Sequence, residues 1–258
     1  PVNASGLPDL DALKKSIRND TVMLAAMLAN NESGVIWPIA KMAALAKEKG
    51  CLLLCDATQA CGKISVDVNA LGVDVLALSA HKFYGPKGAG ALYARRRNPR
   101  VSIAPLLHGG GHENGMRSGT LNVPAIVGMG KAAEIAASGI FAYQENTRPL
   151  RDQIERAMMD ACKAEVFCKN EERLSNTSLI RFPGIVASRL IPLVPNLAFS
   201  TGSACSSALP TPSHVLKAMG CTNEQAFETV RLTLGNLSQE EDIQHTIDLL
   251  KRAIITSL

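Results

Sequence analysis

Two apolar runs, each followed by polar residues, decide the fold of this chain: Cys51-Leu52-Leu53-Leu54-Cys55-Asp56 and Val73-Asp74-Val75-Leu76-Ala77-Leu78-Ser79-Ala80-His81-Lys82. Short, almost wholly apolar runs are typical of strands buried in a parallel sheet. Segments 9–18 and 38–49 space their apolar residues as helices do, and further strands are expected at 21–28 and 90–94. Strands that alternate with helices predict an α/β fold with a mainly parallel sheet.

The character of the sequence changes near residue 138. A charged helix is expected over about 148–164 and a last helix over about 240–255, whereas 229–234 alternates polar and apolar residues. That alternation is typical of a strand with one buried face. We therefore expect a large domain over residues 1–138 and a smaller α+β domain over residues 139–258.

Composition excludes several classes of protein. The chain has 258 residues, a net charge of +4 and 47% hydrophobic residues, which is not the composition of a disordered chain. The charge is too slight and too scattered for a nucleic-acid partner. No uninterrupted apolar run reaches the roughly 18–20 residues that a membrane span needs, so we expect no membrane association. Seven cysteines, an odd number, argue against a disulfide framework and favour the reducing cytoplasm.

The polar residues after the two apolar runs are the strongest candidates for chemistry. Ligands bind at the carboxyl ends of parallel strands, where Asp56 and the run Ser79 to Lys82 would lie. A carboxylate for a pyridine nitrogen and a lysine for a Schiff base suggest a pyridoxal-phosphate site. Ser79 and His81 could bind one phosphate. A structural ion pair between Asp56 and Lys82 explains the pattern equally well.

Three further residues carry weaker signals. Cys205 lies among small residues in 200–207 and could be an accessible thiol or an incidental surface cysteine. Arg231 could bind a substrate carboxylate or form a surface ion pair. His108 and His112 are separated by three glycines, which oppose the helix that their spacing would need to bind a metal, and we expect no metal site.

Taken together, several motifs identify a family. The chain closely resembles the NifS-like cysteine desulfurases of the class V aminotransferase family, which are fold type I pyridoxal-phosphate enzymes. The resemblance covers essentially the whole chain, and its motifs occur in the family's order: Asn30-Asn31-Glu32-Ser33-Gly34, Asp56-Ala57-Thr58-Gln59, the run 79–88, His108 to Glu113, Arg117-Ser118-Gly119-Thr120 and Gly202-Ser203-Ala204-Cys205-Ser206-Ser207.

The resemblance implies how the cofactor, pyridoxal 5′-phosphate, is held. Lys82 would form the covalent link, and Asp56 would pair with the pyridine nitrogen. The remaining contacts would come from Gln59 to the phenolic oxygen, and from Ser79, His81 and, across a homodimer interface, Thr120 to the phosphate.

It also implies the reaction. Asn31 and Arg231 would hold the carboxylate of L-cysteine, and Cys205 would take the substrate sulfur as a persulfide while L-alanine leaves. A sulfur-acceptor or scaffold protein would then receive the sulfur for iron–sulfur cluster assembly or thiolation.

The resemblance is incomplete at the N-terminus. Only 29 residues precede Asn30, and none matches the family's ring-stacking histidine or its Gly/Thr phosphate loop. We therefore expect an incomplete large domain. Two alternatives stay open: a selenocysteine lyase, and an inactive fragment or pseudoenzyme that acts only as a binding protein.

Overall fold

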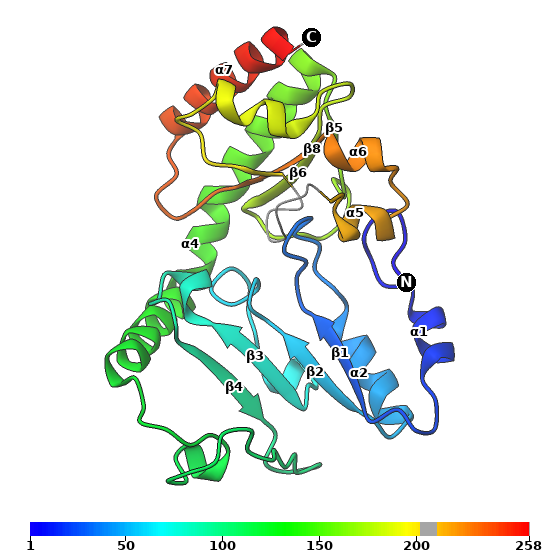
Figure 1. Ribbon diagram of the computed structural model, residues 1–258, viewed down its shortest axis with the longest axis vertical. Coiled ribbons are helices and arrows are strands. Elements are labelled where there is room, and N and C mark those ends of the chain that lie inside the picture. Colours follow the sequence, from blue (N-terminus) through cyan, green and yellow to red (C-terminus); the bar gives the residue numbers. More distant parts are fainter. Residues whose placement is uncertain (202–210, 258) are drawn as a thin grey trace. The chain divides into compact units, whose positions relative to one another are not determined.

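The computed structural model describes residues 1–201 and 211–257, and these divide into two compact units (Figure 1). The sheet unit comprises Lys14–Ala29 and Trp37–Ile140, and the C-terminal unit comprises Pro1–Leu13, Asn30–Ile36 and Phe141–Leu258. Two N-terminal segments thus belong to the C-terminal unit. The domain assignment 1–138 and 139–258 stays a prediction.

The sheet unit is built on four strands in the order β1-β2-β3-β4. Strands β1 (Met23–Met27), β2 (Leu52–Asp56) and β3 (Val75–Ser79) are parallel, and β4 (Gly90–Ala94) is antiparallel to β3. Helix α2 (Ile39–Glu48) packs against β1 and β2. Shorter elements are α3 (Val68–Leu71) and the 3₁₀ turns η1 (Ala80–Phe83) and η2 (Glu113–Gly115). The prediction of an α/β fold with a mainly parallel sheet is confirmed.

Burial along β2 alternates, although its sequence is apolar throughout. Leu53 and Cys55 are fully buried, whereas Leu52 and Leu54 are only half-buried. Successive side chains of a strand point to opposite faces of the sheet. In β2 the more deeply buried side chains, Leu53 and Cys55, therefore lie on one face of the sheet.

The C-terminal unit contains a second sheet, of order β5-β6-β8-β7 and antiparallel throughout. Its strands are β5 (Glu165–Val166), β6 (Thr177–Arg181), β7 (Ser200–Thr201) and β8 (Thr229–Thr233). Helix α7 (Glu240–Ser257) places Ile243, Ile247 and Leu250 in a core with Ile180 and Phe182. The remaining elements are α1 (Leu10–Ser16, which continues into the sheet unit), η3 (Ala187–Arg189), η4 (Ile191–Leu193), α5 (His214–Ala218) and α6 (Asn223–Phe227).

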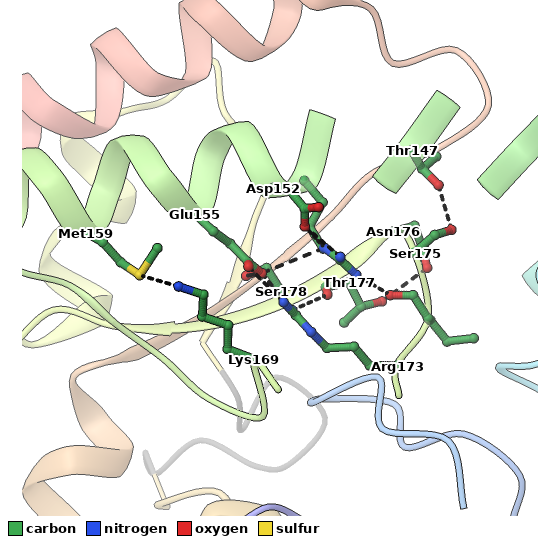
Figure 2. Close-up of polar contacts among 12 residues, drawn as sticks. Thr147, Asp152, Glu155, Met159, Lys169, Arg173, Ser175, Asn176, Thr177 and Ser178 are labelled. Atoms are coloured by element: carbon green, nitrogen blue, oxygen red, sulfur yellow. Dashed lines mark hydrogen bonds and ion pairs between the residues drawn. The ribbon is translucent and has the colours of Figure 1, made fainter. Parts of the chain in front are cut away.

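A buried polar network joins β6 to helix α4 (Val123–Cys162) in this unit (Figure 2). Arg173 donates two hydrogen bonds to Glu155, at 2.6 and 2.7 Å, and Ser178 donates a third at 2.6 Å. Glu155 and Arg173 are 3% and 7% exposed. The two charges offset each other only when Glu155 and Arg173 lie face to face, because burying either charge alone is costly. The pair therefore favours the packing of α4 against β6 that is seen here.

Helix α4 spans both units and is much longer than predicted. The expected helix at 148–164 begins instead at Val123, where Pro124 lies in the first turn and needs no donor. Three glycines between residues 128 and 139 lower the helix propensity of the first half of α4, so the sequence did not predict a helix there.

The N-terminal half of α4 also bears on the membrane expectation. Helix α4 contains an 18-residue window that is long and apolar enough to cross a membrane, by length and composition only, and none of that window is buried in the structure. Val123, Val127 and Ile135 are more than half exposed. Lys131 and Glu134 interrupt the apolar residues here, so the helix passes by its mean hydropathy and not by an uninterrupted apolar run.

Candidate functional site

The carboxyl ends of β2 and β3 bring the first predicted site residues to one edge of the sheet. Asp56 ends β2 and lies opposite Ala77 of β3, two residues before Ser79 ends that strand. The carboxylate of Asp56 is exposed and accepts a hydrogen bond from the backbone N–H of Thr58 at 2.8 Å. This bond orients the carboxylate at the strand end.

Helix η1 presents the next two candidates. Ala80 and Phe83 are buried, which leaves His81 and Lys82 exposed between them. Ser79 Oγ lies 2.8 Å from His81 Nδ1, so hydroxyl and imidazole are adjacent, as two ligands of one phosphate would be. The turn requires Gly85, because a Cβ there would lie 2.9 Å from the Cβ of Ala80.

The turn after β2 carries Gln59 and packs against η1. Gly62 in this turn has φ +76°, and a Cβ there would lie 2.7 Å from the Cβ of Phe83. Lys63, which sequence reasoning missed, donates hydrogen bonds to the carbonyls of Gln59 and Lys82, at 2.8 and 3.3 Å. Burial, followed by the nearby charge of Lys82, lowers the pKa of Lys63 to about 8.

Thr120 is exposed in the loop that precedes α4. The loop is held by Ser118, whose Oγ accepts from the N–H of Gly111 at 3.1 Å, and by His112 Nδ1, which accepts from the N–H of Gly119 at 3.3 Å. His112 thus has a structural role here. Within 1–201 and 211–257, no group of three or more His, Cys, Asp or Glu side chains could hold a metal.

Asn31 and Arg231 meet in the C-terminal unit. The Nη1 of Arg231, on β8, donates to the carbonyl oxygen of Asn31 at 2.8 Å, although 200 residues separate them. The predicted proximity of these two residues is present, but the contact is to the backbone of Asn31. Their binding of a substrate carboxylate stays a prediction.

Glu32, adjacent to Asn31, is a second residue that sequence reasoning missed. Its carboxylate is buried and accepts a 2.6 Å hydrogen bond from the hydroxyl of Ser213, which also caps α5. Burial raises the pKa of Glu32. The side chain of Asn30 accepts from the N–H groups of Glu32 and Ser33, and thereby shapes this turn.

Cys205 lies outside the described residues. Of the six cysteines that are described, burial raises the pKa of Cys55 to about 12 and of Cys61 and Cys168 to about 11, and it also raises the pKa of Cys162 and Cys221. Cys51 is buried. A thiol is nucleophilic as its thiolate, so these environments oppose that role.

The residues at the edge of the sheet unit fit pyridoxal phosphate chemically. Lys82 offers an exposed amine for an aldehyde, Asp56 offers an anion for a pyridine nitrogen, and the Ser79–His81 pair offers donors for a phosphate. All three come from the carboxyl ends of adjacent strands, where this class of fold binds its ligands.

Comparison with known proteins agrees with this chemistry. The family model "Aminotransferase class-V" matches residues 1–246. Curated relatives include the cysteine desulfurase IscS of Histophilus somni (strain 2336), 43% identical over 97% of this chain and 62% of the relative, and that of Methylococcus capsulatus (strain ATCC 33009 / NCIMB 11132 / Bath), 44% identical over 96% and 61%. The chain therefore spans about 62% of the length of these relatives.

Solved structures show the same likeness. The NifS-like protein from Rickettsia africae ESF-5 matches with a TM-score of 0.89 and 30% identity, over 98% of this chain and 68% of that one. Another structure titled NifS-like protein gives the same TM-score at 35% identity, over 100% and 67%. The family model covers nearly all of the sequence, and the chain belongs to the class V aminotransferase family.

Proposed function

We propose that this polypeptide acts as a pyridoxal-phosphate-dependent cysteine desulfurase, a transferase of the sulfurtransferase type. The observation that carries the proposal is the grouping of Asp56, Ser79, His81 and Lys82 at one sheet edge in a chain 43% identical to IscS. The same grouping in an unrelated chain would suggest only an anion site.

The residues would divide the reaction between them. When bound, pyridoxal phosphate supplies an electron sink for the bonds of the substrate's α-carbon. Asp56 would hold a proton on the pyridine nitrogen, Gln59 would orient the ring, and Lys82 would anchor the cofactor and move the α-proton. Ser79 and His81 would bind the phosphate.

The substrate end belongs to other residues. Asn31 and Arg231 would bind the carboxylate of L-cysteine. The thiolate of Cys205 would attack the substrate sulfur, so that the carbon–sulfur bond breaks, a sulfur–sulfur bond forms, and L-alanine leaves with the persulfide on Cys205. An acceptor or scaffold protein of iron–sulfur cluster assembly or thiolation would take this sulfur.

Assembly and location form part of the proposal. A cytoplasmic homodimer would cover the exposed apolar residues of α4 that follow Thr120, namely Val123, Ile126 and Val127. Exposed apolar residues that lie close together on one helix are typical of a protein–protein interface. Thr120 would then reach the phosphate bound by the other subunit.

The first test is the absorbance spectrum of the purified chain after incubation with pyridoxal phosphate. We expect a visible band that Lys82→Ala abolishes, and alanine formation from L-cysteine. Cys205→Ser should retain the band and lose persulfide formation. A colourless wild-type chain would instead support the binding-only alternative, in which the polypeptide is an inactive fragment or pseudoenzyme. Faster release of selenide from L-selenocysteine than of sulfide from L-cysteine would favour a selenocysteine lyase.

A further inference from the structure

Lys63 is a buried cation beside two predicted cofactor residues. It is 8% exposed, and its ammonium group bonds to the carbonyl oxygens of Gln59 and Lys82. Lysines are seldom buried unless their charge is paired or hydrogen-bonded, because the desolvation cost is high. The burial of Lys63 is therefore tied to the hydrogen bonds that its ammonium group makes.

The two carbonyls belong to different turns of the sheet unit. Gln59 lies in the turn after β2, four residues before Lys63, and Lys82 lies in η1 after β3, nineteen residues beyond it. A single ammonium thus links the turn that would orient the cofactor ring to the turn that would hold the cofactor covalently. The packing of Gly62 against Phe83 brings the same two turns together.

The ammonium can make such a link because it carries three donors on a flexible stem. Hydrogen bonds from a charged donor are about twice as strong as neutral ones. The cost of keeping the charge buried also appears in the lowered pKa of Lys63, to which the charge of Lys82 contributes. Such a cost is typical of residues held at functional sites.

We propose that Lys63 is a positioning residue, which sets the backbone of Lys82 relative to Gln59 by bonding to both carbonyls. The inference rests on the proposed function for the roles of Gln59 and Lys82, but the link between the turns does not depend on it.

The experiment compares wild-type chain, Lys63→Met and Lys63→Arg. Methionine keeps the length and apolar contacts of the stem but removes the donors, and arginine keeps the charge and donors. Lys131→Met, at an exposed lysine of α4, is the matched control. Amide hydrogen exchange of the chain without cofactor is followed in segments 57–64 and 80–85, with β1 as the internal reference. Capture of pyridoxal phosphate at Lys82 is then measured by borohydride reduction and peptide mass spectrometry.

We expect Lys63→Met to raise exchange in both segments by roughly fivefold or more, which one lost charged hydrogen bond of about 1 kcal/mol or more would produce. Capture at Lys82 should fall several-fold, and Lys63→Arg should recover part of both losses. Unchanged exchange in either segment would overturn the inference, and so would a rise that is equal in β1, since that would be a general loss of stability. If the wild-type chain captures no pyridoxal phosphate, the proposed function fails, and the exchange data alone decide the role of Lys63.

Discussion

At the scale of the residue, two lysines nineteen positions apart occupy opposite environments. Lys82 is exposed in η1, whereas Lys63 is buried beneath it with its ammonium on the carbonyl of Lys82. Both are lysines next to a strand end, and only packing distinguishes the amine available to a ligand from the amine that holds the backbone. The exposed lysine, Lys82, is thus the candidate for binding the cofactor, and the buried one, Lys63, is the candidate for positioning the backbone.

The buried environment of Lys63 predicts a pH-dependent stability. Its pKa in the folded chain is about 8, below its value of 10.5 when exposed. Below pH 8 both states are charged, and the folded state bears the cost of burial. Between pH 8 and 10.5 the unfolded state binds more protons, so the free energy of unfolding gains up to about 3 kcal/mol as pH rises.

Urea unfolding of wild-type chain and Lys63→Met, at several pH values from about 7 to about 10, checks this prediction. The two chains differ only at Lys63, so the pH dependence of the difference in unfolding free energy reports Lys63 together with the neighbours coupled to its charge, Lys82 and Cys61. The difference should shift in favour of the wild-type chain as pH rises. A difference that does not vary with pH would show that the ammonium is not desolvated.

Arg231 is expected to contribute mainly to substrate binding. Arg231→Ala removes a charged fork worth on the order of 2–4 kcal/mol, so the KM for L-cysteine should rise roughly 30- to 1000-fold, while kcat changes less. Steady-state alanine formation measures this, with Arg189→Ala, at an exposed arginine of η3, as the control. An unaltered KM would limit Arg231 to its contact with Asn31.

At the scale of the element, the network of Glu155, Arg173 and Ser178 joins α4 to β6 (Figure 2). Arg173→Met should destabilise the C-terminal unit by about 3–5 kcal/mol, because it leaves the carboxylate of Glu155 buried without its bidentate partner. Lys131→Met breaks an exposed ion pair on the same helix and should cost less than about 1 kcal/mol. Chemical unfolding followed by circular dichroism gives both values. Equal losses of unfolding free energy in the two variants would contradict the claim that the buried pair matters more than the exposed one.

Regular elements were predictable where their patterns are local. The expected strands at 51–55, 73–78 and 229–234 lie within one or two residues of β2, β3 and β8. The first half of α4 was not predicted as a helix, because its glycines and exposed apolar residues do not follow the helical spacing of apolar residues. Thr229 is one of the polar residues in the alternation at 229–234, yet it is fully buried. Its hydroxyl donates to the carbonyl of Gln225 at 2.7 Å, so the polar group is satisfied without water.

At the scale of the whole molecule, the exposed apolar residues of α4 bear on assembly. If a homodimer covers them, Val127→Glu should shift the chain toward the monomer, because an unpaired carboxylate would be buried at the interface. Val127 is 65% exposed in the structure, so the substitution should not alter folding. Light scattering over a range of concentrations measures the effect, with Thr256→Glu on α7 as a control of equal charge. A wild-type chain that is monomeric at all concentrations would contradict the proposed homodimer.

Part of the candidate site was predictable from local sequence patterns, and part only from the resemblance to a family. The sequence was sufficient to place Asp56 and Ser79 at strand ends, because alternation of strand and helix implies a parallel sheet whose carboxyl ends share an edge. The resemblance then assigned roles to Lys82, Cys205 and Arg231. Cys205 lies outside the described residues, and its assignment stays a prediction.

Only the folded chain shows the contacts that support these residues. The bond between Glu32 and Ser213 spans 181 residues, and that between Arg231 and Asn31 spans 200. Such pairs leave no periodic signal, since a local pattern records which side of an element is buried but not which distant group lies opposite. Propensity and periodicity act over one or two turns of chain, whereas the desolvation that selects partners for Lys63 or Glu155 exists only after distant segments have packed.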